Sequence, residues 1–288
     1  MSVTQTAQLM DGRGLAERIV KEAAAKAAEI SRRTGAGPCL ATVLVGEDPA
    51  SVAYVRMKRA RCARAGIQSR HIGLPAATTT AELIGTLAEL SGDPEVHGIL
   101  LQHPCGPHID ERAAFEAIAP EKDVDGVTMR SFAAMSFALP GFVSCTPGGI
   151  VRLLEAYDVG LAGKRAVVVG RSAILGKPVG MLLLAKDATV TYCHSRTADL
   201  PAIVREADVV VAAVGRPRLI RGEDIKPGAV VIDAGYNPGN VGDVDFDTAR
   251  ARAGLITPVP GGVGPMTIAV LLAQTVEAAA NQLGIGEH

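Results

Sequence analysis

Tyr54 and Lys58, four residues apart, carry the side chains best suited to chemistry in the first half of the sequence. Such a pair lies on one face of a helix. A lysine can give or take a proton because burial readily lowers its pKa, and a tyrosine ring can stack on a flat substrate. Gln102, Asp123 and Asp125 follow a predicted strand or a loop, where α/β sheets bind ligands. The set would suit an electrophilic heterocycle, but the same spacing is more often a half-buried helix face, so both interpretations stay open.

A glycine-bearing loop in the second half has the composition of a nucleotide-binding turn. Residues 166–169 favour a strand, Gly170 allows a sharp turn, and Gly176 allows close approach of the helix predicted at 179–186. A helix N-terminus presents free N–H groups and the positive end of the helix dipole, which together hold a pyrophosphate. The segment is G-x-S-x-x-x-G-x-P rather than the common G-x-G-x-x-G, so an ordinary strand-to-helix turn is the alternative.

Arg171 and Ser172 lie inside this loop, and Ser195 and Arg196 follow the next predicted strand, 188–193. An NAD site usually has an acidic residue after that strand, whereas a cation with hydroxyl groups suits a 2′-phosphate. Two arginines converging from two strand ends therefore predict NADP as the cofactor. Taken singly, each arginine would be an ordinary solvated charge.

Composition argues against several classes of partner. The formal net charge is −1 and no block of like charges occurs, so we expect neither nucleic acid nor a membrane as a partner. We find no apolar run long enough to span a bilayer and no signal-peptide pattern, and we expect a cytoplasmic protein. No metal is predicted, because His103, Cys105 and His108 lack a regular ligand spacing. The five cysteines include no C-x-x-C pair and are expected to be free thiols.

Predicted strands alternate with predicted helices, which is typical of parallel sheets with helices on both faces. The zone 119–149 is rich in loops and is the expected domain boundary. Helices are expected at 11–33, from about 51, and at 80–90, 110–118, 150–157, 179–186 and 268–281, and strands at 39–45, 69–74, 98–102, 166–169, 188–193, 208–214, 229–234 and 255–259.

Several motifs together resemble those of one family. They are Tyr54-Val-Arg-Met-Lys58, Gln102 close before a proline, Lys122-Asp-Val-Asp-Gly126, Cys145-Thr-Pro147, Gly170-Arg-Ser-x-x-x-Gly-x-Pro178, His194-Ser-Arg-Thr197 and Pro258-Val-Pro-Gly-Gly-Val-Gly-Pro-Met-Thr267. On these motifs the chain resembles the bifunctional methylenetetrahydrofolate dehydrogenase/methenyltetrahydrofolate cyclohydrolase family, also called FolD, from about Asp11 to the last helix.

The resemblance implies an α/β fold of two three-layer α/β domains with an active-site cleft between them. Residues 1–145 would form an N-terminal catalytic, folate-binding domain completed by a C-terminal helix, 268–288, and residues 146–267 would form a Rossmann-like NADP-binding domain. The resemblance also implies a homodimer, and it places Lys58 across the cleft from the coenzyme.

The activity that the resemblance implies has two steps. NADP would take a hydride from 5,10-methylenetetrahydrofolate, and the methenyl cation would then be hydrolysed to 10-formyltetrahydrofolate, which serves purine biosynthesis. Lys58 would be the central catalytic group, Gln102 would hydrogen-bond it, Tyr54 would stack on the folate, and Asp125 would anchor the pterin ring. The implied substrate-binding set is Tyr54, Lys58, Gln102, Asp125, Pro265 and Thr267. The implied cofactor-binding set is Thr146, Gly170, Arg171, Ser172, Ser195, Arg196, Tyr236 and Gly262.

Three departures from the family pattern put the balance between the two activities in question. The family usually has Gln-Leu-Pro-Leu-Pro where this chain has Gln102-His-Pro-Cys-Gly-Pro, which alters the wall beside the folate. An Asn-x-Gly turn is usual in the segment that is here 126–135, and isoleucine is common where this chain has Tyr236. The alternatives are a monofunctional version, an NADP-dependent dehydrogenase of an amino acid or shikimate-like substrate, and a non-catalytic NADP sensor.

Overall fold

The computed structural model describes residues 6–286, which form two compact units. The six-stranded unit comprises residues 6–16 and 146–267, and the three-stranded unit comprises residues 17–145 and 268–286. Residues 6–16 were expected in the first domain and instead belong to the six-stranded unit, because strand β1 (Gln8–Leu9) pairs with β9 (Leu255–Ile256). The other expected boundaries, after residues 145 and 267, coincide with the limits of the units. The expected ends at 1–5 and 287–288 lie outside the described residues.

Within the described residues, the six-stranded unit contains a parallel sheet ordered β1-β9-β8-β7-β5-β6. Its other strands are β5 (Arg165–Val169), β6 (Thr189–Cys193), β7 (Val209–Ala212) and β8 (Val230–Asp233). The direction of winding reverses at β5, which pairs with β6 on one side and β7 on the other. Open α/β sheets bind ligands beyond the carboxyl ends of strands at such a point. The loop after β5 therefore lies where a ligand is expected.

Alternate residues of this sheet enter two apolar clusters, one on each face. Val167 and Val210 pack with α8 (Leu200–Arg205) and α9 (Phe246–Arg250). Val168 and Val211 pack with α6 (Cys145–Ala156) and α7 (Gly176–Leu184). The predicted three-layer arrangement is present, and strands β5, after its exposed first residue Arg165, and β7 are apolar because both of their faces are covered.

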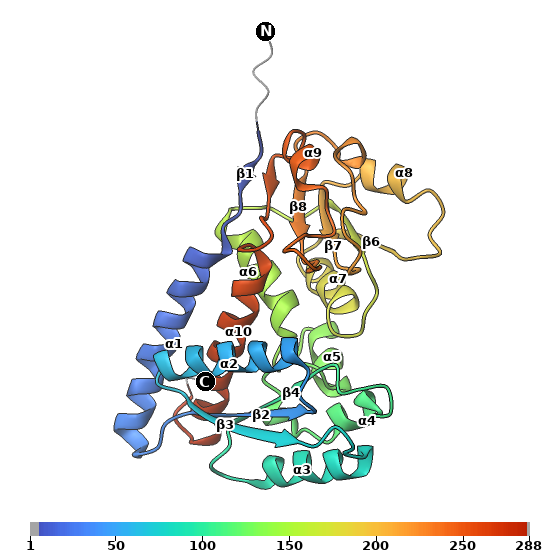
Figure 1. Cartoon of the computed structure of the whole chain (residues 1–288). Helices are drawn as coiled ribbons and strands as arrows, with labels where there is room; N and C mark the ends of the chain where they lie inside the picture. Colours follow the sequence, from blue (N-terminus) through green and yellow to red (C-terminus); the bar gives the residue numbers. More distant parts are fainter. Residues whose placement is uncertain (1–5, 287–288) are drawn as a thin grey trace. The chain divides into compact units, whose positions relative to one another are not determined.

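The three-stranded unit contains a parallel sheet that is ordered β3-β2-β4 in the described part of the chain. β2 (Cys39–Val45) and β4 (Gly98–Gln102) are buried along their length, whereas the edge strand β3 (Gln68–Leu74) is partly exposed. Leu40 and Leu100 pack with residues of α1 (Gly12–Thr34), α2 (Pro49–Arg64) and α10 (Val263–Gln282). Helix α3 (Thr80–Gly92), with α4 (Glu111–Glu116) against it, lies on the other side of the sheet from α2 (Figure 1).

The zone expected to be rich in loops contains two complete helical elements, the 3-10 turn η1 (Pro120–Lys122) and α5 (Met129–Ser136). Helix α5 has Thr128 as its N-cap, and the hydroxyl of Thr128 accepts a hydrogen bond from the amide of Ser131 at 3.1 Å. This helix and the short elements β1, α8 and α9 were not predicted, because they are too brief to show a hydrophobic period.

Two predicted helices begin five residues earlier than expected. Helix α6 begins at Cys145 rather than at residue 150, and α10 begins at Val263 rather than at residue 268. In both cases a proline that we placed in the preceding loop lies in the first turn of the helix, where its missing N–H costs nothing.

Helix α10 also corrects the expectation that no apolar run is long enough to span a bilayer. It has 20 residues, and the mean hydropathy of its 18-residue window is 1.4, so it meets that criterion by length and composition. In the structure, 67% of this window is buried, as in the core helix of a globular protein.

Candidate functional site

Tyr54 and Lys58 lie on helix α2, which follows the carboxyl end of β2. It begins at Pro49, and the carboxylate of Asp48 accepts a hydrogen bond from the amide of Ser51 at 2.8 Å, which satisfies one free N–H group of the first turn. Lys58 is buried and Tyr54 is half-buried. The helix face predicted from the four-residue spacing is therefore present and turned inward.

Lys58, Gln102 and the ring of Tyr54 are in contact. Nζ of Lys58 donates a hydrogen bond to Oε1 of Gln102 at 3.0 Å and lies 4.5 Å from the centroid of the Tyr54 ring. The other end of the Gln102 amide donates to the carbonyl oxygen of His103 at 2.9 Å, which orients the amide. Burial lowers the pKa of Lys58, because the ammonium loses its solvation, and the charge of Asp125 opposes this. The amine can therefore exchange a proton nearer neutral pH than an exposed lysine can.

Asp125 supplies a carboxylate to the same group. Burial raises the pKa of Asp125, whereas the positive charges of Lys58 and His103 and a hydrogen bond from the thiol of Cys145 lower it. Burial and the charge of Asp125 raise the pKa of Tyr54 to about 12, so the phenol stays protonated at neutral pH. His103 and Cys145 are thus neighbours of the site to which the sequence pattern assigned no role. The sequence offered one signal for each of them: His103 directly follows Gln102, and Cys145 is the first residue of the motif Cys145-Thr-Pro147.

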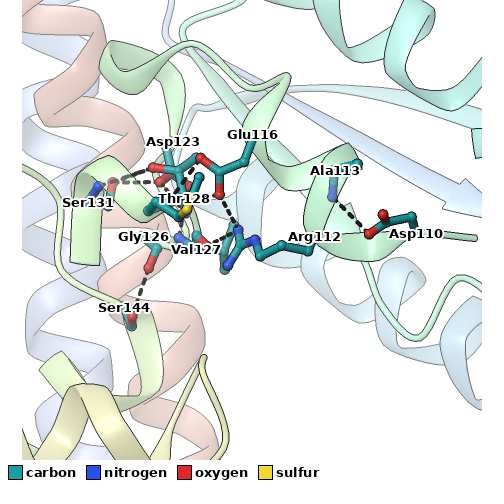
Figure 2. A network of polar contacts seen from close by, with 11 residues as sticks. Asp110, Arg112, Ala113, Glu116, Asp123, Gly126, Val127, Thr128, Ser131 and Ser144 are labelled. Carbon is teal, nitrogen blue, oxygen red and sulfur yellow. Dashed lines mark hydrogen bonds and ion pairs between the residues drawn. The ribbon is translucent and has the colours of Figure 1, made fainter. Parts of the chain in front are cut away.

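Asp123 has a different role from Asp125, although the sequence pattern placed them together. It is fully buried, and its carboxylate accepts hydrogen bonds from the amides of Val127 at 3.1 Å and Thr128 at 3.0 Å (Figure 2). The hydroxyl of Ser131 donates a third bond to it at 2.5 Å. Both carboxylate oxygens thus bond to residues at the start of α5. Asp123 therefore stabilises the fold of residues 127–131.

Cys105 and His108 make separate contacts rather than a shared site. Sγ of Cys105 lies 3.7 Å from the carbonyl oxygen of Gln102, and Nε2 of His108 lies 3.1 Å from the carbonyl oxygen of Thr78. Residues 6–286 contain no group of three or more side chains placed to hold a metal ion. All five cysteines are free and buried, which confirms the prediction of free thiols.

The loop between β5 and α7 depends on its two glycines. Gly170 has a φ of 134°, and a Cβ there would lie 2.3 Å from the carbonyl oxygen of Ala213. A Cβ at Gly176 would lie 2.5 Å from the carbonyl oxygen of Gly170. Oγ of Ser172 accepts hydrogen bonds at 3.1 and 3.2 Å from two backbone amides at the entry to α7. Arg171 and Ser172 are exposed on this compact turn.

The turn after β6 presents a cation and a hydroxyl group to solvent. The amide of His194 donates to Oγ1 of Thr197 at 2.8 Å, and the amide of Arg196 donates to Nδ1 of His194 at 3.2 Å. The side chains of Ser195 and Arg196 are exposed. Because β5 and β6 are parallel neighbours, this turn and the glycine loop follow adjacent carboxyl ends of one sheet. The two loops therefore follow neighbouring strand ends, and the convergence of Arg171 and Arg196 stays a prediction.

Two buried carboxylates that the sequence did not single out organise the loops after β7 and β8. Asp243 accepts hydrogen bonds at 2.6–2.9 Å from three consecutive amides, those of residues 214–216. Asp233, at the end of β8, accepts hydrogen bonds at 2.9–3.0 Å from the amides of Gly235, Asp243 and Val244. Burial raises the pKa of Asp233 to about 6, with a contribution from the charge of Asp243, and the backbone hydrogen bonds oppose the rise.

Tyr236 lies on the loop that these carboxylates hold. It is 73% exposed, and its hydroxyl donates to Oδ1 of Asn240 at 3.1 Å. The base of the loop is tightly packed, since a Cβ at Gly242 would lie 1.9 Å from Oδ2 of Asp233. Tyr236 is therefore an exposed side chain on a loop whose base is closely packed.

The remaining predicted residues lie near the starts of α6 and α10. The hydroxyls of Thr146 and Thr267 are 3.0 Å apart. A Cβ at Gly262 would lie 2.6 Å from Cβ of Thr257, so this turn also requires glycine. Pro265 lies in the first turn of α10.

The predicted site residues fall into two groups, one in each unit. The three-stranded unit holds Tyr54, Lys58, Gln102 and Asp125, which share hydrogen bonds, ring contacts and electrostatic interactions. The six-stranded unit holds Thr146, Gly170, Arg171, Ser172, Ser195, Arg196, Tyr236, Gly262, Pro265 and Thr267. The roles assigned to these residues stay predictions.

Comparison with known proteins covers nearly the whole chain. Residues 10–125 match the family model described as tetrahydrofolate dehydrogenase/cyclohydrolase, catalytic domain, and residues 144–283 match its NAD(P)-binding domain. The chain is 88% identical over 285 residues to Bifunctional protein FolD 1 of Streptomyces avermitilis, with 99% of each sequence covered.

Solved structures agree with these matches. The FolD methylenetetrahydrofolate dehydrogenase/cyclohydrolase of Campylobacter jejuni has a TM-score of 0.93 and 41% identity, covering 96% of this chain and 99% of that one. The FolD of Trypanosoma brucei, solved with NADP cofactor and inhibitor, gives the same TM-score of 0.93, 41% identity and the same coverage of 96% and 99%.

Proposed function

This chain belongs to the tetrahydrofolate dehydrogenase/cyclohydrolase family, and we propose that it catalyses both reactions. The first is the NADP-dependent oxidation of 5,10-methylenetetrahydrofolate to the 5,10-methenyl cation. The second is the hydrolysis of that cation to 10-formyltetrahydrofolate. Relatives that are named bifunctional support two activities in one chain rather than one.

The residues of the six-stranded unit fit NADP. The backbone at Gly170 and Gly176 leaves no space for a Cβ, so a compact, glycine-dependent turn lies at the switch point of the sheet. Arg171, Ser195 and Arg196 are exposed at two adjacent strand ends, and no acidic residue lies among residues 194–197 to repel a 2′-phosphate. NADP supplies the acceptor for the hydride when it is bound. The side chains named here would hold its phosphate groups.

The residues of the three-stranded unit suit a flat, positively charged folate. The ring of Tyr54 offers a face for stacking, and the half-buried carboxylate of Asp125 offers acceptors for the N–H groups of a pterin ring. A neutral Lys58 adds no charge that would oppose the methenyl cation. These three groups therefore bind the product of the first reaction as well as its substrate.

Lys58 is the group that we assign to proton transfer in the second reaction. In its neutral form, Nζ can accept a proton from the water that attacks the methenyl carbon, and it can return a proton to the folate nitrogen that leaves when the ring opens. The hydrogen bond to Oε1 of Gln102 fixes the amine without placing a charge beside it. This buried amine, bonded to an uncharged acceptor and lying over an aromatic ring, is the observation that carries the proposal.

One assay tests the proposal. The purified protein is mixed with 5,10-methylenetetrahydrofolate and NADP, and NADPH and the methenyl cation are followed by absorbance. Methenyltetrahydrofolate is then supplied alone, and its decay is compared with the decay in buffer. Activity in both parts supports the bifunctional enzyme, and activity in one part replaces the proposal with the monofunctional alternative. NADPH formation with shikimate or an amino acid, but not with folate, would refute the folate assignment.

We also propose that the protein is a cytoplasmic homodimer that serves purine biosynthesis through 10-formyltetrahydrofolate. The support for these three statements is the resemblance to the family. Light scattering of the purified protein tests the dimer, and cell fractionation tests the compartment.

A further inference from the structure

Gln274, a buried side chain on α10, contacts the segments that flank Asp125. Its Nε2 donates hydrogen bonds to the carbonyl oxygens of Val124 at 2.7 Å and Val143 at 3.0 Å, and its Oε1 accepts one from the amide of Val143 at 3.2 Å. The same Nε2 lies 3.6 Å from Sγ of Cys145. Since Gln274 is only 4% exposed, water cannot readily replace these bonds when they are lost.

The segment that carries Asp125 is also bonded directly to segment 143–145. The amide of Cys145 donates to the carbonyl oxygen of Asp125 at 3.3 Å. The hydroxyl of Ser144 donates to the carbonyl oxygen of Gly126 at 2.7 Å (Figure 2). Gly126 has a φ of 65°, and a Cβ there would lie 2.4 Å from the backbone of segment 143–145. The two segments are thus in contact, and Gln274 bonds to both.

These contacts fix the backbone on both sides of Asp125. On the carboxyl side, Asp123 bonds to the amides of residues 127 and 128. On the amino side, Gln274 bonds to Val124. Cys145, whose thiol lies against Gln274, donates to the carbonyl oxygen of Val124 at 3.2 Å, one peptide bond before Asp125, the residue that bears the carboxylate. The position of this carboxylate therefore depends on a side chain that follows it by about 150 residues.

We propose that Gln274 is a positioning residue for the folate site. It holds Val124 and Cys145 beside Asp125 and so fixes the carboxylate that anchors the pterin ring. Gln274 acts through Asp125 and touches no substrate. The inference rests on the proposed function, in which Asp125 contacts the folate.

Gln282 provides a matched control on the same helix. Its Nε2 donates hydrogen bonds to the carbonyl oxygens of His97 at 2.8 Å and Glu121 at 3.1 Å. Gln282 thus joins α10 to loops of the same unit with the same kind of bond, but it does not contact the turn that carries Asp125. If Gln274 contributed only to the stability of the fold, substitution of Gln274 and substitution of Gln282 should have the same effects.

The experiment compares Gln274→Met with Gln282→Met, since methionine keeps the length of the side chain and removes its hydrogen bonds. We expect both substitutions to lower Tm. Gln274→Met should raise KM for methylenetetrahydrofolate about tenfold and leave KM for NADP within about twofold, whereas Gln282→Met should leave both KM values within about twofold. An unchanged folate KM in Gln274→Met, or an equal rise in Gln282→Met, would overturn the inference. Should Gln274→Met fail to fold, Gln274→Asn, which keeps the amide but is one methylene shorter, is held to the same criteria.

A double-mutant cycle with Asp125→Ala identifies the residue through which Gln274 acts. Asp125→Ala alone should raise the folate KM, and the addition of Gln274→Met should raise it no further, because the carboxylate that Gln274 positions is already gone. Multiplicative effects would show that Gln274 acts elsewhere and would overturn the inference. The wild-type protein distinguishes failure of the positioning role from failure of the proposed function. If it does not turn over folate, the proposed function is refuted. If it turns over folate normally but the effects of Gln274→Met and Asp125→Ala on KM multiply, only the positioning role is refuted.

Discussion

The amine of Lys58 on helix α2 and the side-chain amide of Gln102 at the end of β4 are joined by a hydrogen bond of 3.0 Å. This bond fixes the amine between a helix and the sheet beneath it. An amide oxygen accepts from the amine but carries no full charge, so it does not stabilise the ammonium as a carboxylate would. Gln102 therefore orients Lys58 while burial still lowers the pKa of the lysine.

Replacement of Lys58 by methionine should remove the proton-transferring group. We expect Lys58→Met to lower the cyclohydrolase rate at least about 100-fold, which is the lower end of the range for loss of a general acid–base group, and to leave the Kd for NADP within about twofold. Lys122→Met is the matched control, because Lys122 is also buried but donates its hydrogen bonds to the carbonyl oxygens of Leu90 and Asp93. It should lower Tm and keep cyclohydrolase activity. Full hydrolysis of methenyltetrahydrofolate by Lys58→Met would refute the role of Lys58.

Replacement of Gln102 by glutamate should move the pH dependence of the cyclohydrolase reaction. A carboxylate beside Nζ favours the ammonium and raises the pKa of Lys58, so a higher pH is needed to obtain the neutral amine. The acidic limb of the kcat/KM profile should therefore shift upward by about one pH unit. A profile that stays in place would show that Lys58 does not set this limb.

Substitution of the two residues that we assign to the phosphates of NADP should weaken the coenzyme preference. We expect the wild-type protein to favour NADP over NAD, and Arg171→Ala with Ser195→Ala should reduce the ratio of kcat/KM values by about tenfold or more, chiefly through KM for NADP. Arg165→Ala is the control, since Arg165 is exposed at the opposite end of β5 and pairs with Glu206. Equal use of NAD and NADP by the unmodified protein would contradict the assignment.

The stability of the six-stranded unit should depend on pH through Asp233. The pKa of this carboxyl is raised from 3.8 to about 6, so between these values the folded chain binds a proton that the unfolded chain has lost. Its contribution to the free energy of unfolding is greatest below pH 4 and falls as pH rises to about 6, by at most about 3 kcal/mol. Urea unfolding between pH 4 and about 7 should show that the advantage of wild type over Asp233→Asn shrinks with pH. A constant difference across that range would contradict the assignment to Asp233.

The longer elements could be predicted from the sequence because their apolar runs are continuous. Strands β2 and β4 begin and end at the predicted residues, since strands of a buried parallel sheet form nearly continuous apolar runs. Helix α5 was missed because it has eight residues and lies in a segment that is rich in turns. Strand β1 was missed because its pairing with β9 joins residues far apart in the chain.

The site could be predicted only where residue type and local spacing carry the chemistry. Tyr54 and Lys58 are one helical turn apart, so their shared face follows from the sequence alone. Asp123 and Asp125 are the same residue type two positions apart, and what separates them is the entry to α5, which the sequence did not reveal. Gln274 was not singled out because its partners are brought to it by tertiary packing.

The core of the three-stranded unit includes side chains of α10 together with those of α1, α2 and β2. Ile268, Leu271 and Leu272 reach this cluster only after the entire six-stranded sheet has left the ribosome, because β9 precedes them in the chain. During synthesis, the apolar surfaces of α1, α2 and β2 that pack against α10 therefore stay uncovered until α10 has been made. A nascent chain arrested before α10 would be the form most in need of a chaperone.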